Sequence, residues 1–354
     1  MLFTSCQVAT AGFLGVNASQ ALTCLALAQR GCATPRSDGG TVGEWHAARG
    51  AALPLWIHVS TPGLVIECLF PMRVNFYGVR GSVPAPGPQT ARYGGNTSCV
   101  EVRLADGSII ALDAGTGLRE LGNTLVREGR ESRVHLLLSH THWDHVMGLP
   151  FFAPLWNKAN HLIVYPLAND AQERFQRNIF DDIHFPVSVH DIPAKVELAK
   201  PDGPEWRIGS ARVRPVQLNH PGGAQGFRID DDDGSSLAYL TDNELNAATA
   251  LITTDALARF AEGVDLLIHD SQYLVSDMPH KLGWGHSIVD DVLALGALAQ
   301  PARLALFHHD PDRTDDALDA LGDRCRSWLK DRSRGVELVM ASEGLCLELS
   351  RSAR

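Results

Sequence analysis

The stretch Val134-His-Leu-Leu-Leu-Ser-His-Thr-His-Trp-Asp-His-Val-Met-Gly148 determines how the rest of the chain is interpreted. Residues 134–138 form an apolar run with the length of a buried strand. Four polar residues follow where this run ends: His140, His142, Asp144 and His145. Two His at i and i+2 point the same way on an extended backbone, and the next two residues stand where the chain can turn into a helix. The four side chains can therefore reach one point at the end of a strand.

The chemistry of these four side chains is that of a metal site. Neutral imidazole and carboxylate groups suit Zn²⁺ and similar divalent ions. A chance cluster of surface His is the alternative interpretation. The position of the cluster directly after a strand of buried type argues against chance.

The pattern H-x-H-x-D-H resembles the signature of the metallo-β-lactamase superfamily. The resemblance implies an α/β fold, a four-layer αβ/βα sandwich in which two β-sheets face each other with helices outside. It covers essentially all of residues 72–354, and it implies further metal ligands downstream of the signature.

Three downstream residues match the later motifs of that family. His220 follows the apolar run 212–218 and matches the third metal-binding motif. Asp242 matches the carboxylate that bridges two metals, and a role as a helix N-cap is the alternative, compatible reading. His308 stands at the place of the last ligand, although its neighbour His309 leaves an ambiguity of one residue.

The resemblance assigns these ligands to two metal ions that share one carboxylate. One ion would be held by His140, His142 and His220, the other by Asp144, His145 and His308, and Asp242 would bridge the two. Zn²⁺ is the expected metal, with Mn²⁺ or Fe²⁺ as alternatives. An open coordination position marks a catalytic site, and such metals lower the pKa of bound water to about 7. The implied activity is therefore hydrolysis by a metal-bound hydroxide.

Two further residues are predicted to assist the metal site. Asp113 ends the strand at 108–112, and by resemblance it orients a ligand His from behind. His286 stands at a predicted helix start among glycines, where an anion can bind. It resembles the loop His of the ribonuclease Z branch, which contacts the scissile phosphate. We predict Asp144 and His286 as the catalytic residues; the alternative for His286 is a bystander beside an N-capping Ser287.

A loop rich in Gly and Pro, residues 78–95, precedes these motifs. It carries Arg80 and leads into Asn96, and it could present both side chains and backbone N–H groups to an anionic substrate. A turn-rich surface connection is the equally weighted alternative. Downstream, apolar periodicity predicts helices at 118–127, 170–180, 245–260, 288–298 and 312–330.

Composition limits the partners and the compartment. The 354 residues carry a net charge of −10, which disfavours broad, sequence-independent binding of nucleic acid. Seven Cys are scattered without a C-x-x-C motif, which suggests a reducing compartment such as the cytoplasm. No membrane association is predicted, and a homodimer is the common assembly of similar proteins.

Residues 1–71 differ from the rest of the chain. They contain three Arg, three acidic residues and no Lys, so the net charge of −10 lies entirely in 72–354. No basic residue precedes Arg30, which argues against a signal peptide, and polar residues dilute the uncharged run 7–28. We expect an N-terminal extension that is poorly ordered or arises from a mis-set start codon, with the hydrolase domain at 72–354. A targeting or anchoring segment is the alternative.

The subfamily depends on finer features. Ligation by His and Asp without Cys, the late Gly-His-Ser segment and the Gly-rich loop resemble the ribonuclease Z and phosphodiesterase side. Ribonuclease Z members commonly carry a Gly-rich basic arm for transfer RNA, and no such run lies between His145 and His220. We therefore predict a small anionic phosphodiester substrate, such as a cyclic nucleotide or cyclic ribose phosphate.

Other functions remain open from the sequence. One is carbonyl hydrolysis, by a thioesterase, lactonase or β-lactamase of the same fold. Another is endonucleolytic processing of the 3′ end of transfer RNA. A third is a non-catalytic, ligand-sensing member, which intact ligation argues against. A di-iron redox member is disfavoured, because that branch normally has a Glu ligand and a following flavin domain.

Overall fold

The computed structural model describes residues 56–58, 67–69, 71–165, 185–333 and 335–349. The chain divides into two compact units, Met1–Phe70 and Pro71–Arg354. In the first unit, β1 (Trp56–His58) and β2 (Glu67–Leu69) pair antiparallel. The predictions for 1–71 fall largely outside the described residues, and so does the helix predicted at 170–180.

The second unit contains two seven-stranded sheets. The first sheet has the strand order β16-β3-β4-β5-β6-β7-β8. Its strands are β3 (Met72–Gly78), β4 (Cys99–Arg103), β5 (Ile109–Leu112), β6 (Arg133–Leu137), β7 (His161–Tyr165), β8 (Lys195–Leu198) and β16 (Cys346–Leu349). The last strand of the chain thus returns to pair antiparallel with β3, whereas β5 to β8 run parallel.

The second sheet has the order β15-β14-β13-β12-β11-β10-β9. Its strands are β9 (Trp206–Ile208), β10 (Ala211–Leu218), β11 (Ala224–Asp231), β12 (Ser236–Leu240), β13 (Leu266–Asp270), β14 (Arg303–Phe307) and β15 (Glu337–Met340). Here β12 to β15 run parallel. Parallel strands end at one common edge, so residues that follow them are brought together.

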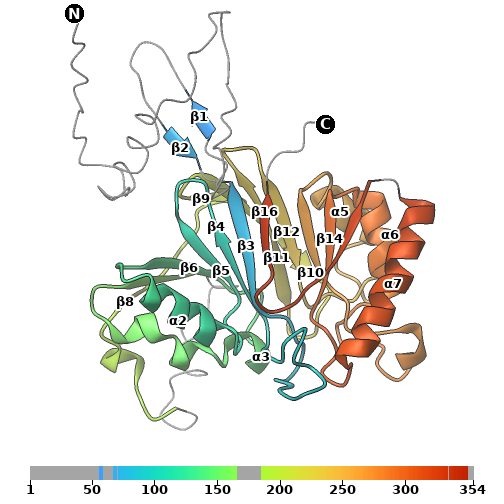
Figure 1. The fold of residues 1–354 in the computed structure, drawn as a ribbon, viewed down its shortest axis with the longest axis horizontal. Helices are drawn as coiled ribbons and strands as arrows, with labels where there is room; N and C mark the ends of the chain where they lie inside the picture. Colours follow the sequence, from blue (N-terminus) through green and yellow to red (C-terminus); the bar gives the residue numbers. More distant parts are fainter. Residues whose placement is uncertain (1–55, 59–66, 70, 166–184, 334, 350–354) are drawn as a thin grey trace, which may run out of the picture. The chain divides into compact units, whose positions relative to one another are not determined.

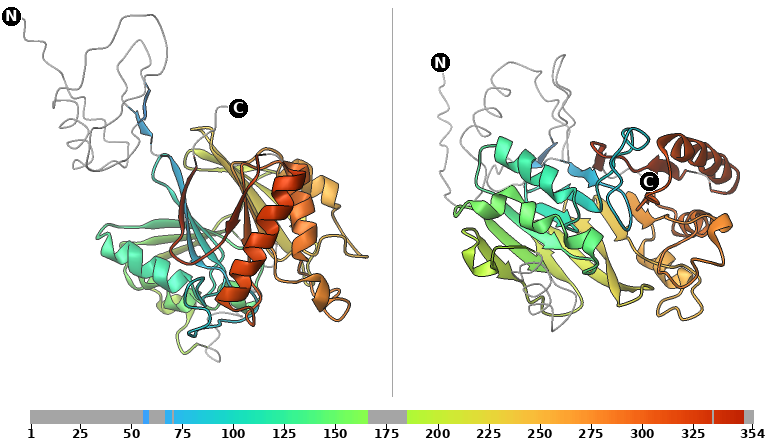
Figure 2. Two further views of the ribbon diagram at one scale, coloured as in Figure 1. Left: turned by 45° about the vertical axis from the view of Figure 1, so that its right-hand side comes forward. Right: turned by 90° about the horizontal axis from the view of Figure 1, so that it is seen from below.

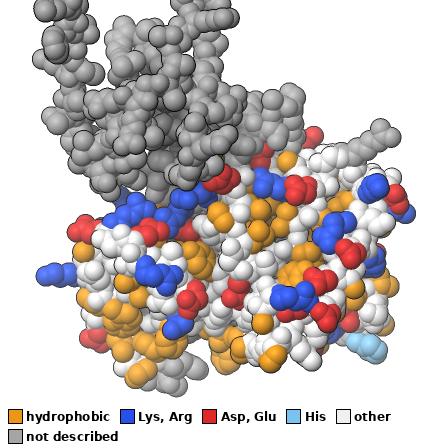
Figure 3. All heavy atoms as spheres, viewed as in Figure 1, with side chains coloured by type: hydrophobic (Ala, Val, Ile, Leu, Met, Phe, Trp, Pro, Cys, Tyr) orange, Lys and Arg blue, Asp and Glu red, His pale blue; other side chains and the backbone are white. Residues whose placement is uncertain are grey.

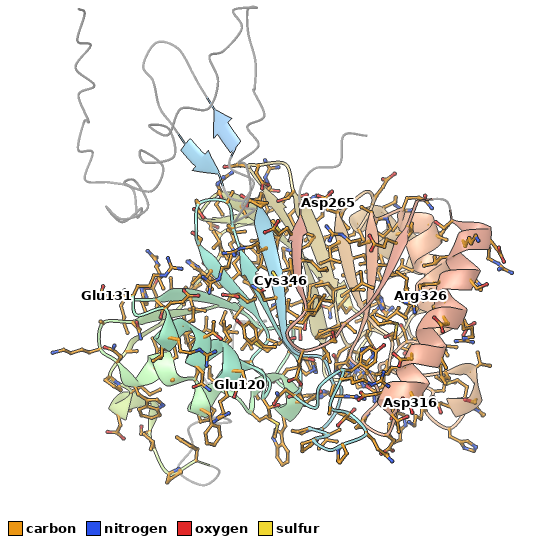
Figure 4. The ribbon with its side chains drawn as sticks, viewed as in Figure 1. Glu120, Glu131, Asp265, Asp316, Arg326 and Cys346 are labelled. Carbon is orange, nitrogen blue, oxygen red and sulfur yellow. The ribbon has the colours of Figure 1, made fainter. Side chains whose placement is uncertain are left out.

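Helices cover the outer faces of the sheets (Figures 1 and 2). They are α2 (Leu118–Arg127), α3 (Trp143–Val146), α5 (Thr254–Phe260), α6 (Val289–Ala299) and α7 (Asp315–Arg332), with short 3₁₀ turns at Leu149–Phe151, Ala153–Trp156, Val189–Asp191 and Val275–Asp277. Asp316 and Arg326 are exposed side chains of α7 (Figure 4). None of the described helices is long and apolar enough to cross a membrane.

Apolar side chains form three buried layers. One lies between the sheets and includes Phe76, Tyr239 and Phe307. The ring of Phe307 contacts that of Phe76 across the sandwich and that of Tyr239 in its own sheet. A second lies under α5, α6 and α7, and a third under α2. Each large apolar side chain that is fully buried contributes about 1.5–3 kcal/mol. The layers establish the predicted αβ/βα sandwich.

One predicted helix is considerably shorter than expected. The sequence predicts a helix at 245–260, whereas α5 begins at Thr254. Asn246 adopts a left-handed backbone with φ 61°, and the Thr253 side chain caps the helix by accepting from Ala256 N. The segment before α5 instead packs beside the strand ends, where it contributes to the site described next.

Candidate metal centre

The predicted ligands lie in α3 or shortly after the ends of β6, β10, β12 and β14, elements that can be followed in Figure 1. The chain turns sharply there: Asp113, Asp242 and His308, which directly follow or lie close after β5, β12 and β14, have φ of 60°, 51° and 59°. Such left-handed backbone is uncommon outside Gly and costs on the order of 1–3 kcal/mol per residue. The turns aim side chains from both sheets into one space.

The seven predicted ligands form two sets. The first set consists of His140, His142, His220 and Asp242, and the second of Asp144, His145, Asp242 and His308. Within each set, one potential ligand atom per residue lies within 4.8 Å of the others. The structure thus brings together every side chain that the sequence proposed as a ligand.

Asp242 belongs to both sets of ligands. One of its carboxylate oxygens faces the first set and the other faces the second. Its Oδ2 lies 3.5 Å from His140 Nε2 and 3.8 Å from His220 Nε2. Its Oδ1 lies 3.1 Å from His145 Nε2 and 3.2 Å from His308 Nε2. A carboxylate in this position can contribute one oxygen to each of two ions.

The polar atoms of the cluster fit a metal better than they fit one another. The Nε2 atoms of His140 and His145 are buried and make no hydrogen bond within the described part of the chain. Leaving a buried polar atom unsatisfied costs about 1–3 kcal/mol. Coordination of a divalent ion would satisfy both nitrogens, and imidazole and carboxylate are suitable ligands.

The protonation states also suit metal binding. Burial raises the pKa of Asp144 and Asp242, but neighbouring His side chains, His145 first, hold both pKa values below their usual range. Burial lowers the pKa of His140 and His220, which favours neutral imidazole. His145 is different: burial opposes its charge, yet Asp242 and the other carboxylates raise its pKa, so a metal would have to displace that proton.

Asp113 supports the second set from behind. It is completely buried and accepts hydrogen bonds from Ser139 N at 2.7 Å and Ser139 Oγ at 2.8 Å. His145 Nδ1 and Tyr239 Oη each lie 2.8 Å from its Oδ2. The bond to Nδ1 fixes the imidazole so that Nε2 faces the cluster. Tyr239 comes from β12 in the opposite sheet, and no local sequence pattern marks its contact with Asp113.

His286 lies beside both sets. Its side chain is almost fully buried, and its ring centroid lies 5.0 Å from that of His308 and 5.3 Å from that of His220. Its Nδ1 lies 3.0 Å from Asp270 Oδ2. Burial opposes the charged form, but Asp270 raises the pKa of His286 to about 9. Asp270 ends β13, and its place at the same strand edge was the sequence signal that could have identified it.

Arg80 and Asn96, which the sequence predicted to contact an anion, have partners within the protein. Arg80 is completely buried, and its guanidinium donates to the carbonyl oxygens of Gly94, Asp310 and Arg313. The Asn96 side-chain amide donates to Glu343 Oε2 at 2.9 Å. The full burial of Arg80 therefore corrects its prediction as a substrate-binding residue, whereas the role of Asn96, which is partly exposed, stays a prediction. Both side chains tie the loop 78–95 to neighbouring segments.

The loop nevertheless reaches the cluster through its backbone. Ser82 N donates to Asp144 Oδ2 at 2.8 Å, and Gly81 lies so close to His308 that an added Cβ would be 2.4 Å from Nδ1. The ambiguity at the last ligand is also resolved geometrically. His309 turns away and its Nε2 lies 2.9 Å from Ala341 O, whereas His308 belongs to the second set.

Comparisons with known proteins agree with this architecture. A family described as "Beta-lactamase superfamily domain" matches residues 109–309. An uncharacterized protein of Mycobacterium leprae is 26% identical over 261 residues, 71% of this chain and 82% of that protein. Ribonuclease Z of Haloarcula marismortui is 23% identical over 77% of this chain and 96% of its own length. The metallo-beta-lactamase fold protein YhfI from Bacillus subtilis superposes with a TM-score of 0.58 at 20% identity, over 78% of this chain and 99% of YhfI.

Proposed function

Because the chain belongs to the β-lactamase superfamily of metallohydrolases, we propose that it hydrolyses a small or cyclic phosphodiester. The observation that carries this proposal is the His286–Asp270 pair, which lies directly beside both sets of ligands. Hydrolysis of a phosphodiester needs stabilisation of charge on the non-bridging oxygens and a proton for the leaving oxygen. A cationic imidazole at this place can supply either.

The residues of the site have separate tasks in this proposal. Asp270 engages Nδ1 of His286 and leaves Nε2 as the nitrogen that can face a substrate oxygen. Asp242 and the six other predicted ligands would hold two divalent ions, Zn²⁺ in our proposal. Bound ions of this kind supply ionised water near neutral pH and positive charge for an anionic transition state. Asp144 is held in its ligating orientation by Ser82 N.

Charge supports a small substrate. The net charge is −10, and on the face shown in Figure 3 acidic and basic side chains are interspersed. Extended nucleic acid binds to clustered Lys and Arg, so a compact anion drawn to the metal site fits better. Similarity to ribonuclease Z supports phosphorus rather than carbonyl chemistry. A cytoplasmic location and a homodimer remain predictions.

The test is hydrolysis of bis(p-nitrophenyl) phosphate by the full chain, metal-loaded and after chelation. A thioester and a chromogenic β-lactam are assayed beside it. We expect metal-dependent turnover of the diester alone, and turnover of cyclic nucleotides in a subsequent screen. Cleavage of the thioester or the β-lactam without diester turnover would refute the phosphodiesterase assignment.

A further inference from the structure

A buried carboxylate, Glu244, clamps the loop that carries His286. Glu244 is 5% exposed and lies two residues after Asp242. Its Oε1 accepts from Gly283 N at 3.0 Å and its Oε2 from Gly285 N at 2.9 Å. Hydrogen bonds to an ionised acceptor are roughly twice as strong as neutral ones, so this side chain fixes two backbone positions of the loop.

The clamped loop in turn holds a ligand of the first set. Nδ1 of His220 donates a hydrogen bond to Gly285 O at 2.9 Å, which leaves the unprotonated Nε2 directed at the cluster. The fit is close, because a Cβ added at Gly285 would lie 2.1 Å from the same Nδ1. Gly285 also has φ 89°, which favours Gly. A small displacement of the loop would therefore reorient the imidazole.

Glu244 is itself tied to the segment that contains His220. Its backbone N donates to Asn219 O at 2.9 Å, and Asn219 N donates to Asn243 Oδ1 at 3.0 Å. Residues 243–244 thus fix the backbone before His220, and they also fix the carbonyl group of Gly285 that accepts the hydrogen bond from His220 Nδ1. These contacts place Glu244 two hydrogen bonds from the proposed metal.

We propose that Glu244 is the positioning residue of the first metal subsite, His140–His142–His220–Asp242, as Asp113 is of the second. Glu244 then serves the first subsite alone, whereas Asp113 binds His145 of the second subsite directly and reaches His140 of the first only through Ser139 Oγ. The inference rests on the proposed metal site but is independent of the substrate. A carboxylate is required because Gln would direct an N–H at a backbone N–H on one of its two contacts.

The experiment measures metal binding without substrate. Full-length protein is stripped of metal and titrated with Zn²⁺ against a chromophoric chelator, for the wild type, Glu244→Gln and Asp113→Asn. We expect Glu244→Gln to weaken one of two bound equivalents by about 10–100-fold, the range for loss of a residue that orients a metal-binding His, and to leave the other unchanged. Asp113→Asn should weaken mainly the other equivalent, whose His145 it contacts directly.

The subsites are assigned by combination with His220→Ala. If Glu244 acts through His220, then Glu244→Gln adds no further loss in the His220→Ala background, whereas Asp113→Asn still weakens the remaining ion. Asp231→Asn is the matched control. Asp231 is also a buried carboxylate that accepts from a backbone N–H, that of Ala105 at 2.8 Å, but it lies at the end of β11 away from the ligands, so this variant should bind both equivalents like the wild type.

Thermal unfolding in excess chelator separates positioning from general stability. If Glu244→Gln does not fold, Gly285→Ala tests the same link, because its Cβ would push against His220 and should weaken the same equivalent. Wild-type affinity at both subsites, or an equal loss at both, would overturn the proposal. Failure of diester hydrolysis with this metal pattern intact would refute only the proposed substrate.

Discussion

Replacement of Asp113 by Asn is expected to weaken the metal held by Asp144, His145 and His308. Asn keeps one acceptor oxygen, which can still receive Ser139 N. It replaces Oδ2 by an amide group, and Oδ2 is the atom beside His145 Nδ1, Tyr239 Oη and Ser139 Oγ. The two hydroxyls can rotate and become acceptors, but His145 can adapt only by moving its proton to Nε2.

This shift of the proton from Nδ1 to Nε2 determines how much metal affinity is lost. An imidazole protonated on Nε2 cannot use that atom as a ligand, and the lost charge-assisted hydrogen bond contributes about 1.5–3 kcal/mol. Since each 1.4 kcal/mol is a factor of ten in affinity, this corresponds to a loss of roughly 10–150-fold. The value agrees with the usual cost of removing such a supporting residue.

The assay is competition for Zn²⁺ with a chelator of known affinity, resolved into two equivalents. Tyr239→Phe is the control, because it removes one donor and leaves the His145–Asp113 bond intact, so its effect on affinity should be below tenfold. Unchanged metal affinity in Asp113→Asn, with a normal fold, would refute the argument that this carboxylate sets the tautomer of His145.

Three shorter predictions concern other parts of the chain. His286→Ala should lower kcat for the diester at least 100-fold, the typical share of a proton-transferring group, and leave both metal equivalents bound; a kcat near that of the wild type would remove it from the reaction. Arg80→Met leaves three carbonyl groups without their donors and should lower the free energy of unfolding by about 3 kcal/mol or more in urea titration, with little change in KM. Burial first, then Arg133, lowers the pKa of His135 to about 4. The neutral imidazole of His135 therefore contributes fully to the free energy of unfolding above about pH 6.5, and this contribution is lost as the pH falls toward 4. Between pH 7 and 5 the wild type should therefore lose about 1 kcal/mol more than His135→Asn, after allowance for partial exposure.

The sequence predicted the site best where the functional residues are close together in one short segment. His140 to His145 follow a strand without interruption, and the resemblance then selected His220, Asp242 and His308 at later strand ends. The sandwich followed from the same resemblance, and helix 118–127 agrees with α2 to the residue. The motif and the helix depend on residues that are neighbours in the sequence, so a single sequence is enough to recognise them.

The supporting contacts could not be predicted in the same way. Tyr239 reaches Asp113 across the two sheets, and Glu244 reaches a loop some forty residues downstream. Neither has a local signature, because a tyrosine in a strand or a glutamate before a helix is ordinary. Arg80 was mispredicted for the complementary reason. An Arg in a Gly-rich loop resembles an anion-binding residue, and only the fold shows that Arg80 is buried and that its Nε and Nη1 donate to backbone carbonyls.

The left-handed residues at the strand ends lead to a last prediction, which concerns stability. Asp113, Asp242 and His308 all have φ between 51° and 60°, where an L-residue costs about 1–2 kcal/mol and Gly almost nothing. In ordinary strands Gly is less stable than Ala by roughly 0.5–1 kcal/mol. At position 308 the order should reverse in metal-free protein, so that His308→Gly is more stable than His308→Ala by about 1 kcal/mol. Both variants lose the same imidazole, and their comparison in urea therefore isolates the backbone. If His308→Ala is the more stable variant, the backbone at position 308 is not strained. The orientation of the His308 side chain would then be set by its contacts alone.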